Sequence, residues 1–183
     1  MKPNRRSIRL PGYDYASAGW YFVTMCCKNR AHLFGEIRDG EMILNEAGVI
    51  VKESWLETEI IRPNCRIHDF IIMPNHFHGI VEITGSPFPD FQETEQAKFV
   101  SPSGTLGSII RGFKINTIKK IRDQVCKGEL QFAPTAMKIK EMDFKIWQRN
   151  YYEHIIRNEV SHNKIAAYIR NNPVNWQEDE YFR

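Results

Sequence analysis

Residues 73–81 have the sequence Met-Pro-Asn-His-Phe-His-Gly-Ile-Val, and the segments on both sides of this run indicate how the chain folds. An apolar segment, residues 65–73, leads into a Pro-Asn turn, and a second strand-like segment, residues 77–84, follows it. Side chains alternate across a β-strand, so His76 and His78 are predicted to lie on one face and Phe77 on the other. Two neutral imidazoles that converge on one point suit a metal ion. Because His-x-His alone is a weak motif, two partly exposed histidines bonded only to neighbours remain the alternative.

Length and composition indicate a single domain over residues 1–183. Apolar residues make up 42% of the chain and charged residues 26%, as in soluble globular proteins. No run is long and apolar enough to span a bilayer, and the basic N-terminus lacks the apolar stretch of a secretory signal. We therefore expect a cytoplasmic protein without a membrane partner. The four cysteines show no C-x-x-C spacing, so we expect buried, reduced thiols.

Positive charge is concentrated in two places. Residues 1–10 form a basic arm without an acidic residue, and residues 104–122 also contain only basic charges. Such concentrations fit a polyanionic partner, whose phosphates they would neutralise. A solvated helix face and a frayed terminus are the alternative. The candidate phosphate contacts are Arg5, Arg6, Arg111, Lys114 and Lys119.

The order of elements predicts an α+β fold. Aromatic and branched residues at 20–27 indicate a buried strand, and segments 33–37 and 41–44 indicate a hairpin with an Asp-Gly turn. A helix follows Asn45, a plausible N-cap, and ends before Pro63. After the two strands around the histidines, we expect a loop insertion at 85–103, a helix at 106–125, a fourth core strand at 142–147, and helices at 150–158 and 159–172. This split βαβ order predicts an antiparallel sheet with helices on one face.

The last predicted helix carries two residues that could complete a site. Tyr168 and Asn172 are four residues apart and therefore share one helix face. The Asn172 amide oxygen suits a hard cation, so it could join His76 and His78 as a third metal ligand. Tyr168 would then be a nucleophile beside the metal. Taken singly, each residue favours the ordinary reading: a tyrosine packed on the sheet with its hydroxyl at the rim, and a helix-end asparagine before Pro173.

Several stretches together resemble one family. They are Trp20-Tyr-Phe-Val-Thr24, the run at 73–81, Leu106-Gly-Ser-Ile-Ile-Arg-Gly-Phe-Lys114, Trp147-Gln-Arg-Asn-Tyr-Tyr-Glu-His-Ile-Ile-Arg157 and Tyr168-Ile-Arg-Asn-Asn-Pro173. In order and spacing, over residues 10–176, the chain resembles the repeat-associated tyrosine transposases. These are single-tyrosine HUH nucleases, as are the IS200-like transposases of insertion sequences.

The resemblance implies a ferredoxin-like fold whose central strand presents the histidines and whose C-terminal helix presents the tyrosine. It implies nicking and strand transfer on single-stranded, hairpin-forming DNA, with tyrosine attached to the 5′ phosphate. By position, His76 and His78 match the metal ligands, Tyr168 the nucleophile and Asn172 the polar residue that completes a Mg²⁺ or Mn²⁺ site. His154 lies in a shared motif without an assigned role. The protein would act as a monomer or a homodimer.

Tyr151 and Tyr152 are rival nucleophiles in the shared motif. On a helix, their partners four residues later would be Ile155 and Ile156, which cannot bind metal, so the pairing favours Tyr168. The tyrosine pair is then a core or base-stacking element. Two other functions stay open: a non-catalytic nucleic-acid-binding protein, and a metal-dependent hydrolase of small phosphoesters.

Overall fold

The computed structural model describes residues 12–85, 104–128 and 133–182. The predicted basic arm with Arg5 and Arg6, and the predicted insertion from residue 86 to 103, lie outside these residues. In chain order the strands are β1 (Gly19–Cys26), β2 (Gly35–Arg38), β3 (Glu41–Leu44), β4 (Cys65–Ile72), β5 (His76–Ile83) and β6 (Tyr152–Ile156); the α-helices are α1 (Glu46–Ile61), α2 (Leu106–Lys127), α3 (Ala133–Glu141) and α4 (Glu159–Asn171).

Four strands form one antiparallel sheet in the order β4-β5-β1-β6. The chain passes from β1 through the β2-β3 hairpin and α1 to β4, and β5 lies between these two strands. It then passes from β5 through α2 and α3 to β6, which pairs with the other side of β1. This is the split βαβ arrangement, and it confirms the α+β class and the antiparallel sheet. The strand with the two histidines, β5, occupies a central position.

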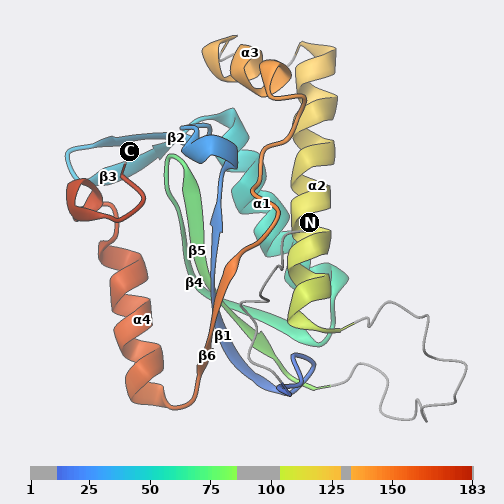
Figure 1. Ribbon diagram of the computed structural model, residues 1–183, viewed down its shortest axis with the longest axis vertical. Helices are drawn as coiled ribbons and strands as arrows, with labels where there is room; N and C mark the ends of the chain where they lie inside the picture. Colours follow the sequence, from blue (N-terminus) through green and yellow to red (C-terminus); the bar gives the residue numbers. More distant parts are fainter. Residues whose placement is uncertain (1–11, 86–103, 129–132, 183) are drawn as a thin grey trace, which may run out of the picture.

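One face of the sheet is covered by α1 and α2, as predicted (Figure 1). Its core contains the rings of Trp55 from α1, Phe77 from β5 and Phe113 from α2. The Trp55 and Phe77 centroids are 4.7 Å apart, and those of Trp55 and Phe113 are 5.1 Å apart. All three residues are buried. Because Phe77 is fixed in this core, the histidines on either side of it must face the opposite side of the sheet.

The opposite face is covered by α4 (Figure 1). Phe22 of β1 and Ile80 of β5 pack there against Ala166 and Ile169 of α4. The prediction placed the helices on one face, and it did not anticipate this second layer. The physical reason is that β1 and β5 carry apolar side chains on both faces, so each face requires a cover.

The fourth strand of the sheet lies later in the chain than predicted. Residues 142–147 were expected to form it, but they form turns, and their only bridge in the described part of the chain joins Trp147 to Cys27. Asp143 and Phe144 have φ angles of 51° and 53°, which no strand allows. The expected helix at 150–158 is wrong as well, because Tyr152–Ile156 forms β6.

Local signals set the other boundaries as predicted. The Asn45 side chain accepts a hydrogen bond from the Gly48 N–H at 3.0 Å and begins α1. Asp39 and Gly40 have φ angles of 51° and 77°, as a hairpin turn of type I′ requires. Among the described residues, no helix is long and apolar enough to cross a membrane.

The cysteines are all free, as expected, but they are not all buried. Cys27 and Cys65 lie in the core, Cys26 is half-buried, and Cys126 is exposed on α2. The prediction of four buried thiols is therefore wrong for Cys126, because it lies at the solvent-facing end of a helix whose opposite face holds the core contacts.

Candidate metal and nucleophile site

The two histidines of β5 lie side by side under α4 and the C-terminal segment. His76 is fully buried and His78 is 1% exposed. The Nε2 atoms of the two rings are 3.0 Å apart. The two rings are therefore buried and not partly exposed, and two nitrogen atoms are directed at one point.

The His76 ring has a defined tautomer. The Asn75 side chain donates through Nδ2 to the Tyr181 carbonyl at 2.8 Å, so its Oδ1 faces His76. His76 Nδ1 lies 2.8 Å from this Oδ1, which can only accept. The proton therefore resides on Nδ1, and the lone pair of His76 Nε2 is free to bind a cation.

The His78 ring is held by a threonine on the neighbouring strand. Thr24 is paired with His78 across β1 and β5, and its Oγ1 lies 2.8 Å from His78 Nδ1. A hydroxyl both donates and accepts, so Thr24 satisfies either tautomer of His78. Without a cation, His78 Nε2–H donates to His76 Nε2, and Thr24 donates to His78 Nδ1. If His78 held a cation through Nε2, its proton would lie on Nδ1 and Thr24 would accept it. This threonine was not identified from the sequence.

Both imidazoles are neutral at physiological pH. Burial, with smaller contributions from the positive charges of Arg30 and His32, lowers the pKa of His76 to about 3. Burial and the neighbouring His76 hold the pKa of His78 well below its usual range. Neutral imidazole is the form that binds metals, so neither ring has to lose a proton before it binds a cation.

Helix α4 brings the tyrosine to the histidines. The Tyr168 hydroxyl lies 3.2 Å from His78 Nε2, and the residue as a whole is 44% exposed. Burial, followed by the charges of Asp179 and Glu180, raises the pKa of Tyr168 to about 12. The hydroxyl is thus protonated at neutral pH and would need added positive charge to ionise.

Asn172 lies one turn after Tyr168 and is 2% exposed. Its Nδ2 donates to Asp179 Oδ2 at 2.8 Å. Its Oδ1 is buried and has no hydrogen-bond partner among the described residues. A buried carbonyl oxygen without a partner is costly, and a cation would satisfy it.

An acidic residue from the C-terminal segment completes the cluster. After the 3-10 turn Trp176–Glu178, the chain passes over the histidines, and Tyr181 lies 4.7 Å from the His76 ring. One ligand atom each of His76, His78 and Asp179 lies within 4.8 Å of the others. Two neutral nitrogens, a carboxylate and an unpaired amide oxygen form a donor set that fits a divalent cation. No sequence spacing identified Asp179, because it follows β5 by about a hundred residues.

The predicted phosphate contacts lie apart from this cluster. Arg111 and Lys119 are exposed on α2, on the other side of the sheet. Lys114 Nζ donates to the carbonyls of Gln148 at 2.9 Å and Asn150 at 3.1 Å, and burial lowers its pKa to about 8. Lys114 therefore also positions the segment that enters β6.

The rival tyrosines lie at the start of β6, with Tyr151 directly before the strand and Tyr152 as its first residue. Tyr151 packs against the core on the α1-α2 side, and the Lys114 ammonium lies 5.8 Å from its ring centroid. Tyr152 and His154 are exposed on the side of Phe22. The argument that excluded the two tyrosines assumed a helix and is therefore wrong. The geometry supplies a better one, since the Tyr168 hydroxyl itself lies within hydrogen-bond distance of a histidine.

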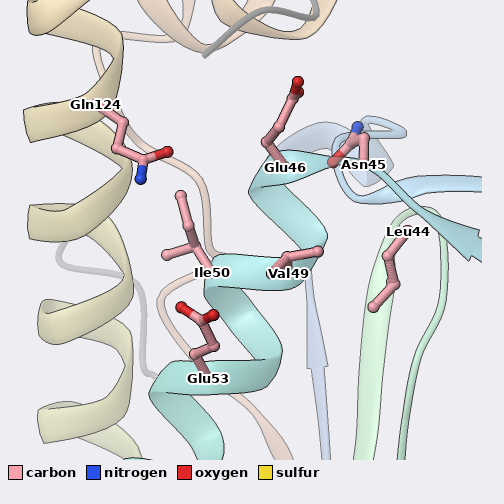
Figure 2. Close-up of a pocket in the computed structure, with 7 residues that line it drawn as sticks. All are labelled: Leu44, Asn45, Glu46, Val49, Ile50, Glu53 and Gln124. Atoms are coloured by element: carbon pink, nitrogen blue, oxygen red, sulfur yellow. The ribbon is translucent and has the colours of Figure 1, made fainter. Parts of the chain in front are cut away.

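A surface hollow of about 580 Å³ lies elsewhere, between the start of α1 and the end of α2 (Figure 2). Glu46 and Glu53 line it together with Asn45, which caps α1, and among the residues that the structure describes no basic side chain lines it. Its negative charge disfavours a phosphate ligand. This hollow is not a candidate for the site predicted from the histidines.

Comparisons with known proteins identify relatives in sequence and in fold. No protein-family model matches the chain. A Haemophilus influenzae (strain Rd) protein, described only as an uncharacterized protein, is 42% identical over 184 aligned residues, which cover 98% of this chain and 93% of that protein. A solved structure of a REP-associated tyrosine transposase bound to a REP hairpin matches with a TM-score of 0.56 and 19% identity, over 93% of this chain and 74% of that one. The chain therefore belongs to one family with the Haemophilus protein and has the fold of the REP-associated tyrosine transposase.

Proposed function

We propose that the protein is a DNA-nicking and strand-transfer enzyme that acts on single-stranded, hairpin-forming DNA through Tyr168. The observation that carries this proposal is the position of the Tyr168 hydroxyl, 3.2 Å from His78 Nε2 and beside a donor set for a divalent cation. A tyrosine that only filled space against the sheet would not need two buried histidines and a half-buried aspartate near its hydroxyl.

In the reaction, the Tyr168 oxygen attacks a phosphodiester phosphorus. The bond from phosphorus to the 3′ oxygen breaks and the 5′ phosphate stays on the tyrosine. The phenol gives up one proton and the 3′ oxygen takes up one as it leaves as a hydroxyl, so no net proton is consumed. A second transfer, in which a 3′ hydroxyl attacks the phosphotyrosine, reseals a strand and restores the tyrosine. His76, His78, Asn172 and Asp179 would hold Mg²⁺ or Mn²⁺. The bound ion would supply positive charge that favours the tyrosinate and polarises the phosphodiester.

The choice of substrate rests on two observations. The structural neighbour is bound to a REP hairpin, and this chain shares its fold. Tyr168 is exposed whereas His76 and His78 are buried, so a polymer could reach the tyrosine without entering the histidine pair. We propose that the protein binds this DNA as a monomer or homodimer in the cytoplasm.

The proposed phosphate contacts are Arg5, Arg6, Arg111, Lys114 and Lys119. Because Arg111 and Lys119 lie on the far side of the sheet from Tyr168, they would bind the stem or flanking DNA and not the cleaved phosphate. Charge reversal at Arg111 and Lys119 should lower the slope of log affinity against log salt by about 0.9 per lost contact. An unchanged slope would mean that the exposed basic face of α2 is only solvated and does not bind DNA.

The decisive experiment traps the covalent product. A single-stranded hairpin oligonucleotide labelled on the 3′ side of the cut should become attached to the wild-type protein in Mn²⁺, and peptide mapping should find the label on the peptide with Tyr168. Tyr168→Phe should bind the oligonucleotide and form no adduct. Tyr151→Phe is the control and should form it.

Three outcomes would contradict the proposal. An adduct on Tyr151 or Tyr152 would move the nucleophile to β6. Metal-dependent cleavage without any adduct would make water the nucleophile and the protein a phosphoester hydrolase, whereas DNA binding without cleavage in any divalent metal would leave a non-catalytic binding protein.

A further inference from the structure

Strand β6 forms an edge of the four-stranded sheet and presents one exposed aromatic ring beside the site. The order β4-β5-β1-β6 leaves one side of β6 without a partner in the described part of the chain. Tyr152 is 48% exposed on this strand. It pairs with Thr24 of β1, and His154 pairs with Phe22, so both face the side of the sheet that carries the histidines.

A chain of rings connects Tyr152 to the nucleophile. The Tyr152 centroid lies 6.4 Å from that of Phe22. Phe22 stacks on His78, with centroids 5.4 Å apart and planes at 24°. Phe22 also meets the Tyr168 ring edge-on at 6.2 Å. The buried Phe22 thus separates the exposed Tyr152 ring from the reacting residues by a single side chain.

Packing does not explain the exposed ring. Ile155 and Ile156 supply the core contacts of this strand on its two faces, whereas Tyr152 leaves about half of its surface in solvent. Helix α4 packs mainly on β4, at the other edge of the sheet, and so leaves the β6 side of this face less covered. An exposed aromatic ring at an open position beside a site is typical of base stacking.

The charges around β6 fit the same ligand. Arg149 precedes the strand and Arg157 follows it, and both are exposed. Two cations at the ends of an exposed aromatic strand match a nucleic acid strand, whose bases stack while its phosphates are neutralised.

We propose that Tyr152 is a stacking platform for an unpaired base of single-stranded DNA, and that it positions the nucleotides beside the phosphate that Tyr168 attacks. His154, next on the same face, would border this base. The inference rests on the proposed function for the identity of the DNA, but it concerns binding and can be tested without cleavage.

The test uses a short oligothymidylate with one 2-aminopurine, whose fluorescence falls on stacking, and a Tyr168→Phe background in which no adduct forms. Loss of one base–aromatic stack corresponds to about 5- to 150-fold weaker binding. Tyr152→Ala and Tyr152→Leu should therefore weaken binding in this range and abolish the quenching. Tyr152→Phe should retain both. Ile60→Ala, which removes a side chain 83% exposed on α1, is the control and should change neither.

Two outcomes of this test would overturn the stacking proposal. Unchanged affinity and quenching in Tyr152→Leu would show that no base stacks there, and equal losses in Tyr152→Phe and Tyr152→Ala would assign the effect to the hydroxyl. Tyr152→Leu keeps an apolar strand residue and protects the test against misfolding of the alanine variant. A failure here with an intact Tyr168 adduct in wild type would leave the proposed nicking activity standing. Stacking without an adduct would refute the nicking activity and keep the platform.

Discussion

Thr24→Val is the substitution that best separates metal binding from mere folding at the histidine pair. Valine has nearly the shape of threonine, and position 24 is 3% exposed, so the core on this face keeps its packing. The change removes the hydroxyl that lies 2.8 Å from His78 Nδ1. His78 Nδ1 then loses its hydrogen-bond partner, while the stack on Phe22 and the contacts of Nε2 remain.

The structure gives the size of the effect. Leaving the buried His78 Nδ1 without a partner should cost about 1–3 kcal/mol of folding free energy. Loss of a residue that orients a metal ligand typically weakens metal binding about 10- to 100-fold. At a fixed Mn²⁺ concentration well above the dissociation constant, the metal should therefore stabilise the variant by about 1.4–2.7 kcal/mol less than the wild type.

The assay combines calorimetric titration of Mn²⁺ with urea unfolding in EDTA and in Mn²⁺. Thr24→Ser keeps a hydroxyl and should restore most of the affinity. Thr117→Val is the matched control, because Thr117 is also fully buried but donates to the Phe113 carbonyl inside α2, far from the histidines. It should change stability without changing Mn²⁺ affinity.

Wild-type Mn²⁺ affinity in Thr24→Val would refute the reasoning, since it would mean that His78 needs no partner at Nδ1. An equal loss of affinity in Thr117→Val would refute it differently, by showing that any weakened core loosens the site.

Three further outcomes are expected. Asp179→Asn should weaken Mn²⁺ binding by at least about tenfold while the fold, followed by circular dichroism, stays intact, because it removes the one carboxylate of the donor set; unchanged binding would remove Asp179 from the site. The pKa of His76 is about 3 in the folded protein, against 6.5 in the unfolded chain. Below pH 6.5 the unfolded state therefore binds more protons, and the free energy of unfolding decreases as the pH is lowered. In EDTA, when the pH is lowered from neutral to about 5, the free energy of unfolding of His76→Asn should decrease by about 2 kcal/mol less than that of the wild type. An equal decrease in urea unfolding would contradict a buried neutral ring. Under native conditions a thiol reagent should label Cys126 first and spare Cys27 and Cys65, since burial raises the pKa of the Cys65 thiol to about 12; early labelling of Cys65 by mass spectrometry would show that β4 opens.

Local chemistry in the sequence determined the elements whose signals lie within a few residues. The Asp39-Gly40 turn and the Asn45 cap need only their own neighbours, and both form as predicted. The alternation at His76, Phe77 and His78 fixes which side chains share a face, and burial of Phe77 then decides which face that is. The spacing of Tyr168 and Asn172 likewise placed both on the side of α4 that meets the histidines.

Only the tertiary structure decided the features that depend on distant partners. Residues 150–158 could form a helix or a strand, and the free edge of β1 selected the strand, because pairing there satisfies backbone groups that a local pattern does not count. Helix α4 lies opposite α1 and α2 because Phe22 and Ile80 required a cover. Asp179 reaches the histidines through the folding of the chain, and Thr24 reaches them through strand register. Both residues are far from the histidines in sequence. A sequence pattern records local geometry, whereas the completion of a buried polar site depends on which distant side chains satisfy it.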